Sequence, residues 1–97
     1  MKAILISYSQ AHEERILAIL DRLNLRGFTS WDETKGRGTT NGEPHLGSHA
    51  WPALNGTMIV IAPAEKAPSL LRDLRALDAE KPALGLRAFQ WAIEESV

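Results

Sequence analysis

The sequence contains no cysteine, and this absence excludes a disulfide framework, a zinc site built on thiolates and a catalytic thiol. It also lacks an excess of charge of either sign, because 11 basic side chains oppose 12 acidic ones and the formal net charge is −1. Such a balance gives no electrostatic footprint for nucleic acid, so we expect no nucleic-acid partner. Long hydrophobic runs are missing too. The longest, Met58–Ala64, is far shorter than the roughly 18–20 residues of a membrane span, and we expect no direct membrane insertion.

The 97 residues are enough for one domain and too few for two. The segment Met1–Tyr8 is too short and too strand-like for a signal peptide, so we predict a single cytoplasmic domain over residues 1–97. Glycine and histidine are unevenly distributed within it. Four of the seven glycines and two of the three histidines lie within Gly36–His49, which makes this segment the first candidate for a functional site.

Hydrophobic periodicity predicts a set of strands and helices. The predicted strands are Lys2–Tyr8, Phe28–Glu33, Thr57–Ala62 and Leu86–Glu94. A first helix is expected between Ser9 as its N-cap and Gly27 just beyond its C-terminal end, with His12 on its surface near the start. A second helix is expected over Glu65–Ala79, with Pro68 in or near its first turn.

This order of elements is typical of the ferredoxin-like βαββαβ fold, an α+β arrangement in which a four-stranded antiparallel sheet carries both helices on one face. The segments Ile4–Ile6 and Met58–Ala62 are apolar at successive positions, whereas a sheet with one face in water alternates apolar and polar side chains. Because two helices cover only one face, we predict a homo-oligomer in which copies of the chain cover the other. The alternative is a central strand that tolerates some exposure.

The segment between residues 34 and 56 has no periodicity, and a loop of this length is unusual in a compact domain unless it is functional or disordered. At its start, Lys35–Gly38 combines glycines that let the backbone approach a ligand with two basic side chains. Gly85 and Arg87 repeat this combination where a loop leads into the last strand. The pattern favours an anion or phosphate site. Solvated turns are the alternative, because the phosphate-loop and Rossmann patterns are both absent.

A second hypothesis concerns metal binding. The imidazoles of His45 and His49 and the carboxylate of Glu43 are of the types that ligate metals, and another subunit would have to complete the coordination shell. Pro44 and Gly47 argue against the helix that would place both imidazoles on one face. The alternative is therefore that His45 and His49 are polar loop residues that bind no metal.

No set of nucleophile, base and orienting group can be assembled from this sequence. The serines lie in no nucleophile-elbow motif. Asp32 and Glu33 are neighbours on a strand and point to opposite faces, so they do not form a paired acid and base. We expect no enzymatic activity.

The order of elements, the long loop before the third strand and several glycine-containing stretches resemble the PII signalling superfamily, in particular its shorter PII-like members. The stretches that carry the resemblance are Gly27-Phe28-Thr29, Lys35-Gly36-Arg37-Gly38, Gly42–Pro52 and Gly85-Leu86-Arg87-Ala88-Phe89. The resemblance covers nearly the full chain.

The resemblance implies a homotrimer that binds adenine nucleotides in clefts between subunits. The base of a long T-loop, at about residues 34–56, would lie on one side of the cleft and the end of a B-loop on the other. The implied ligand-binding residues are Thr29, Lys35, Gly36, Arg37, Gly38, Gly85 and Arg87. The T-loop of such proteins docks on a protein partner, such as a transporter or an enzyme, and we expect the same here.

One departure from the pattern narrows the expected ligand. The full B-loop sequence Thr-Gly-x-x-Gly-Asp-Gly-Lys is missing, and Ala79–Leu84 contains no glycine. This argues against a sensor of 2-oxoglutarate and Mg-ATP. The expected ligand is ADP, AMP, ATP or another anion, and the alternative is that the chain binds no nucleotide. The metal hypothesis corresponds to the related trimeric CutA-like proteins, with the loop histidines as ligands.

Overall fold

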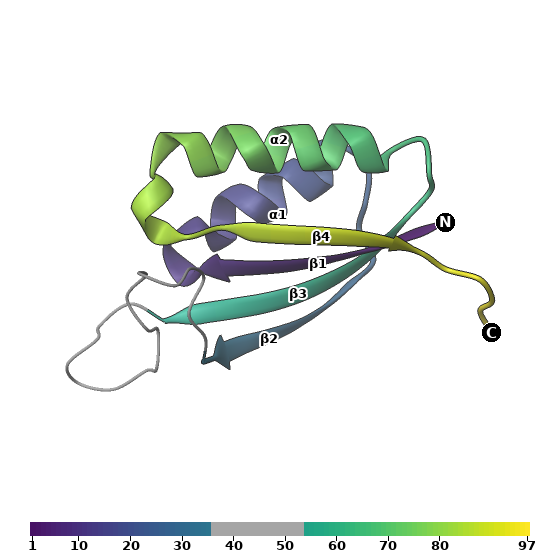
Figure 1. Cartoon of the computed structure of the whole chain (residues 1–97), viewed down its shortest axis with the longest axis horizontal. Helices are drawn as coiled ribbons and strands as arrows, with labels where there is room; N and C mark the ends of the chain where they lie inside the picture. Colours follow the sequence, from purple (N-terminus) through teal and green to yellow (C-terminus); the bar gives the residue numbers. More distant parts are fainter. Residues whose placement is uncertain (36–53) are drawn as a thin grey trace.

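The computed structural model describes residues 1–35 and 54–97 as a four-stranded sheet with two helices. In chain order the elements are β1 (Lys2–Ser9), the 3-10 turn η1 (Gln10–His12), α1 (Glu13–Arg22), β2 (Phe28–Thr34), β3 (Asn55–Ala62), α2 (Ala67–Glu80), the 3-10 turn η2 (Pro82–Leu84) and β4 (Arg87–Ala92). The strand order is β2-β3-β1-β4 and every neighbouring pair is antiparallel. Both helices lie on one face of the sheet (Figure 1). The predicted ferredoxin-like fold is confirmed.

The first helix begins and ends differently from the prediction. Ser9 does act as a cap, but its Oγ accepts from the Ala11 backbone N–H over 3.3 Å at the start of η1, and α1 begins only at Glu13. Gly27 is not the residue that ends the helix. Asn24 adopts the left-handed conformation instead, with φ of 57°, because asparagine tolerates this region better than other non-glycine residues. The chain therefore leaves the helix three residues earlier than predicted.

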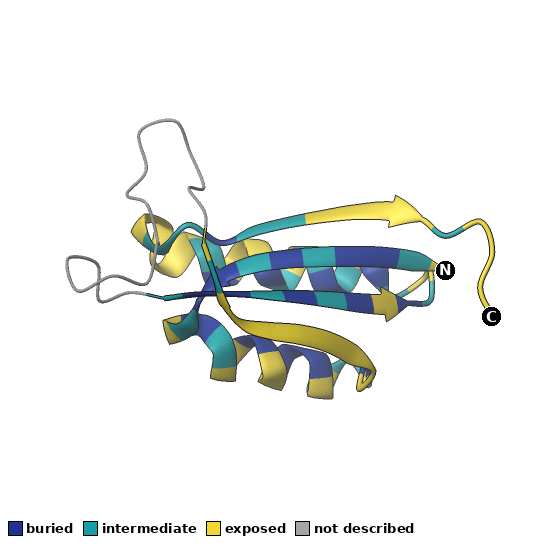
Figure 2. Cartoon of the chain, turned by 90° about the horizontal axis from the view of Figure 1, so that it is seen from below, coloured by how far each residue is buried: buried dark blue, intermediate teal, exposed yellow. Residues whose placement is uncertain are grey.

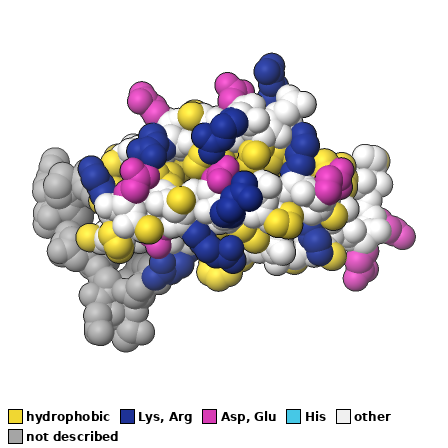
Figure 3. All heavy atoms as spheres, turned by 90° about the horizontal axis from the view of Figure 1, so that it is seen from above, with side chains coloured by type: hydrophobic (Ala, Val, Ile, Leu, Met, Phe, Trp, Pro, Cys, Tyr) yellow, Lys and Arg dark blue, Asp and Glu magenta, His cyan; other side chains and the backbone are white. Residues whose placement is uncertain are grey.

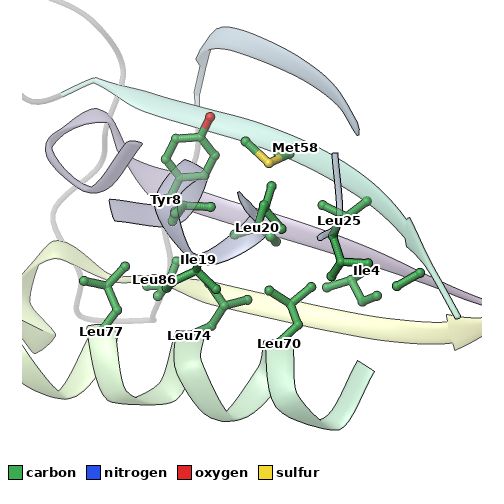
Figure 4. Packing of buried hydrophobic residues seen from close by; sticks show 14 of the residues in the cluster. Ile4, Tyr8, Ile19, Leu20, Leu25, Met58, Leu70, Leu74, Leu77 and Leu86 are labelled. Carbon is green, nitrogen blue, oxygen red and sulfur yellow. The ribbon is translucent and has the colours of Figure 1, made fainter. Parts of the chain in front are cut away.

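The core lies between the sheet and the two helices. Alternate residues of the central strands, Ile4, Ile6 and Tyr8 on β1 and Met58 and Val60 on β3, are fully buried on the helix side. The helices meet them with apolar residues at helical spacing (Figure 4): Ile16, Ile19, Leu20, Leu70, Leu74 and Leu77. The buried side chains of β1 and β3 thus do alternate. Their second apolar set points to the other side of the sheet.

Two ion pairs join the outer surfaces of the helices. Arg15 on α1 contacts Glu80 on α2 at 2.7 Å, and Arg22 contacts Asp73 at 2.9 Å. Because the earlier residue of α1 pairs with the later residue of α2, the two helices run antiparallel. Side chains of both charges are interspersed over this side of the molecule (Figure 3), which gives it no single-sign patch.

We call the sheet face without helices the open face (Figure 2). It carries the second apolar set, which consists of Ala3, Leu5, Ile59, Ile61, Phe89 and Trp91. Three of these large side chains are exposed in a single chain: Ile61 by 44%, Trp91 by 49% and Phe89 by 59%. The prediction that the helices leave one apolar face without cover is therefore confirmed. In the described part of the chain, no helix has the length and hydropathy of a membrane span.

Candidate functional site

Of the predicted ligand-binding residues within the described structure, Lys35, Gly85 and Arg87 lie at one end of the sheet, where β1 and β2 end and β3 and β4 begin (Figure 1), whereas Thr29 lies near the start of β2, away from this end. We call this the loop end. The strand register places Trp31, Thr57, Ser7 and Arg87 in one row across the sheet there. Directly opposed residues of antiparallel strands point to the same face, so all four side chains of this row lie on the open face. Trp31 is 48% exposed and does not anchor the core of a single chain.

Hydrogen bonds hold the two strand ends that flank residues 36–53. The backbone N–H of Gln10 donates to the Leu54 carbonyl oxygen over 2.8 Å, and the Gln10 Nε2 donates to the Asp32 carbonyl oxygen. The hydroxyl oxygens of Thr34 and Thr57 lie 2.9 Å apart. Gln10 therefore ties both flanking segments to η1. Sequence reasoning missed this role, because a glutamine after a cap carries no pattern that distinguishes it from a surface residue.

The residues implied for the T-loop base are only partly within the described structure. Thr29 is exposed on β2, and its partner across the ladder is Ile59, so its side chain lies on the open face. Lys35 is exposed directly after β2. Gly36, Arg37 and Gly38 lie outside the described residues, as does most of the predicted T-loop.

The B-loop end is described in full. Gly85 follows η2 with φ of 75°, a left-handed conformation that favours glycine, and its N–H donates to the Pro82 carbonyl oxygen over 3.1 Å. Arg87 begins β4, where it is opposed by Ser7, and its Nη1 donates to the Leu86 carbonyl oxygen over 3.0 Å. The glycine thus turns the chain into the strand, and the strand places the guanidinium at the loop end.

The two implied halves of the site lie on opposite edges of the sheet. Thr29 and Lys35 belong to β2 and its end, Arg87 belongs to β4, and β3 and β1 separate the two edge strands. With about 4.8 Å between neighbouring strands, the edges are about 14 Å apart. One chain therefore does not bring the two halves into contact.

His12 departs from the prediction of a surface residue. It is 4% exposed, and its Nε2 has no hydrogen-bond partner within the described residues. Burial lowers the pKa of His12, Arg15 and Lys81 lower it further, and Asp78 and Glu80 raise it. A cavity of about 90 Å³ lies beside it, lined by Ala11, His12, Arg15, Leu77, Glu80, Lys81 and Leu84. The prediction failed because η1 turns the chain before α1, which rotates His12 towards the second helix.

The metal hypothesis is not tested by the structure. His45, His49 and Glu43 all lie outside the described residues. Within residues 1–35 and 54–97 there is no group of three histidine, aspartate or glutamate side chains that could hold a metal ion. The loop histidines as metal ligands stay a prediction.

The sequence matches no known protein family, and no curated protein matches it significantly. The fold, in contrast, is similar to solved structures. One is the nitrogen regulatory PII-like protein CPII from Thiomonas intermedia K12, bound to ADP, AMP and bicarbonate, with a TM-score of 0.74 and 22% identity over 95% of this chain and 88% of that chain. The same protein bound to ADP and bicarbonate gives a TM-score of 0.75 and 22% identity over 93% and 82%.

A proposed PII-like signalling protein from Thermus thermophilus is also similar, with a TM-score of 0.63 and 23% identity over 93% of this chain and 83% of that chain. At 22–23% sequence identity, the comparison establishes a shared fold. The similarity extends over nearly the full length on both sides, as the resemblance predicted. The chain has the α+β fold of the PII-like proteins.

Proposed function

We propose that this chain is a PII-like regulatory protein that forms a homotrimer, binds an adenine nucleotide or a related anion between subunits, and signals to a protein partner through residues 34–56. The observation that carries the proposal is the placement of the two halves of the site on opposite edges of one sheet, beside an apolar face without cover. An arrangement of this kind is complete only when copies of the chain assemble.

The open face supports the assembly. Ile61, Phe89 and Trp91 are large apolar side chains that a single chain leaves about half exposed. Neighbouring apolar groups on one surface mark an interaction site more often than isolated ones do. Burying this face against other copies removes the apolar surface from water, at about 25 cal/mol per Å² of buried area.

The two edges support a ligand site between copies. In the proposed trimer, the β2 edge of one subunit, with Thr29 and Lys35, meets the β4 start of the next, with Gly85 and Arg87. Lys35 and Arg87 supply positive charge, and an arginine guanidinium can bind a phosphate through two parallel hydrogen bonds. The backbone glycines add N–H groups without the steric bulk of side chains.

The ligands of the similar structures indicate the class of molecule. CPII has been solved with ADP, AMP and bicarbonate, all of which are anions. A cleft lined by Lys35 on one side and Arg87 on the other suits the phosphate of a nucleotide. We therefore infer ADP or AMP as the first ligands to test, with ATP and bicarbonate beside them.

Signalling is assigned to the long segment between β2 and β3. The segment starts next to the implied ligand residues, and its flanking ends are tied to η1 through Gln10. A ligand at the loop end would therefore act directly on the residues from which the segment emerges. A protein partner, such as a transporter or an enzyme, would recognise the effect of the ligand on this segment.

Isothermal titration calorimetry with ADP, AMP, ATP and bicarbonate tests the proposal. We expect at least one nucleotide to bind and Arg87→Ala to weaken it by about 1.5–3 kcal/mol, the usual value for a lost charged hydrogen bond. Arg26→Ala is the matched control: it removes the same charge at the far end of β2, where the side chain is 78% exposed. If no ligand releases heat, or if both variants bind alike, the proposed site is wrong.

A further inference from the structure

A groove of about 420 Å³ lies between α2 and the edge strand β4, on the helix side of the sheet (Figure 1). This volume is within the range of small-molecule sites, about 300–1,000 Å³. Much of its lining is apolar and comes from both elements: Leu71, Leu74, Leu86 and Ala88. The groove is separate from the proposed nucleotide site, because none of Thr29, Lys35, Gly85 and Arg87 lines it.

Two side chains of opposite charge line the same groove from α2. Arg75 and Asp78 are three residues apart, so they lie on the same side of the helix. Within residues 1–35 and 54–97 the guanidinium of Arg75 forms no ion pair, and Oδ1 of Asp78 has no hydrogen-bond partner although it is buried. Asp73 and Glu80 on the same helix, in contrast, are paired with arginines of α1. The two groove charges are therefore available to a ligand.

The pair of charges restricts what the groove can bind. A guanidinium binds a carboxylate through two parallel hydrogen bonds, and a carboxylate accepts hydrogen bonds from an ammonium group. A purely apolar ligand would cover both charges and supply no partner for either. A ligand with only a carboxylate would bring a like charge to Asp78, and a ligand with only an amine would bring one to Arg75. The ligand that matches both charges and the apolar lining has an ammonium, a carboxylate and an apolar group.

We propose that the groove between α2 and β4 binds a free amino acid with an apolar side chain, such as leucine. The carboxylate of the amino acid pairs with Arg75 and its ammonium group with Asp78. The apolar side chain contacts Leu71, Leu74 and Leu86. The amide of Gln90, which lines the groove from β4, adds a donor and an acceptor beside the two charged groups. This site extends the proposed function by a second class of ligand.

Titration of the full-length protein with leucine, followed by methyl NMR, tests the proposal. We expect the methyl resonances of Leu71, Leu74 and Leu86 to shift with added leucine, and those of Ile59 and Ile61, on the open face, to stay in place. The titration uses no nucleotide, so its failure leaves the proposed function standing. If none of the groove methyls shifts at millimolar leucine, the proposal is wrong.

Ligand analogues and variants test the two charged contacts. Isocaproate, which lacks the ammonium group, and isoamylamine, which lacks the carboxylate, should each bind at least about tenfold more weakly than leucine. Arg75→Gln and Asp78→Asn should weaken leucine binding to a similar extent. Arg72→Gln is the matched control, because Arg72 is on the same helix but outside the groove, 3.5 Å from Asp73.

Circular dichroism confirms that each variant is folded. Arg75 is exposed, so its substitution tests the site even if the change at the partly buried Asp78 impairs folding. Analogues that bind as tightly as leucine, or equal losses with Arg72→Gln and Arg75→Gln, would overturn the proposal.

Discussion

The ring of Tyr8 lies directly against Gly56, its partner across the β1–β3 ladder. A Cβ built on Gly56 would lie 2.6 Å from Cζ of Tyr8 and 2.7 Å from its hydroxyl oxygen, closer than real Cβ contacts allow. Tyr8 is fully buried, so the ring cannot move aside into solvent. Burial raises the pKa of Tyr8, and the negative charges of Glu13 and Asp32 raise it further, so the phenol stays neutral beside the strand. A glycine is therefore required where β3 leaves the loop end.

The first prediction concerns this contact. Gly56→Ala should lower the free energy of unfolding by about 1–3 kcal/mol, the usual cost of an overpacked core. Urea denaturation followed by circular dichroism measures the loss. Gly27→Ala is the matched control, because a Cβ at Gly27 has no neighbour within 4 Å, and this change should stay within about 0.5 kcal/mol. The contact is not a constraint if the two variants are equally stable.

The second prediction concerns pH. The pKa of His12 is lowered in the folded chain from its ordinary value of 6.5, mainly by burial, so the unfolded chain takes up the proton first on acidification. The stability from neutral His12 is present above about pH 6.5 and is lost as pH falls towards the lowered pKa. His12→Leu should therefore flatten the decline of unfolding free energy below about pH 6.5. Glu14→Gln, which changes an exposed helix residue, should keep the decline of the parent. Identical pH profiles for all three proteins would show that His12 is not the group whose protonation lowers the stability.

The third prediction concerns the open face. Ile61 and Phe28 are 44% and 43% exposed, but they lie on opposite faces of the sheet, because Phe28 is opposed by the buried Val60. Ile61→Asp should dissociate the oligomer, since it places a charge in the proposed interface, and Phe28→Asp should leave the assembly intact. Size-exclusion chromatography coupled to light scattering measures the molar mass of each variant. If both variants assemble, the open face is not the interface.

The fourth prediction follows from the distance between the two sheet edges. Lys35→Glu and Arg87→Glu should each abolish nucleotide binding, because each reverses a charge on one wall of the proposed cleft. Mixed trimers of the two variants, made by co-expression, should regain it. In them, wild-type Lys35 of one subunit meets wild-type Arg87 of the next. If the mixed trimers still fail to bind nucleotide, Lys35 and Arg87 do not face each other across a cleft between subunits.

Much of this fold could be predicted from the sequence because its core follows simple periodicity. Met58 and Val60 alternate with Ile59 and Ile61, and this uninterrupted apolar run correctly predicted a strand with two apolar faces. The second helix was predicted over nearly its observed length, since Leu70, Leu74 and Leu77 recur at helical spacing and Pro68 marks its start.

The sequence-based predictions failed where tertiary contacts determine the local structure. The first helix was expected to end just before Gly27, yet it ends earlier, and Asn24 takes the left-handed conformation that follows it. His12 was expected in water, and packing of η1 against α2 buries it. For the candidate site, the sequence predicted Gly85 and Arg87 at one end of the sheet, but it gave no signal for Gln10, whose partners Asp32 and Leu54 are distant in the chain.

Native mass spectrometry of the full chain with ADP tests the central claim most directly, because one spectrum reports both the number of chains and the number of bound ligands. The account predicts a complex of three chains that takes up to three ADP molecules and loses them with Arg87→Glu but not with Arg26→Glu. A single chain under native conditions, or a trimer that retains no ADP, would contradict it.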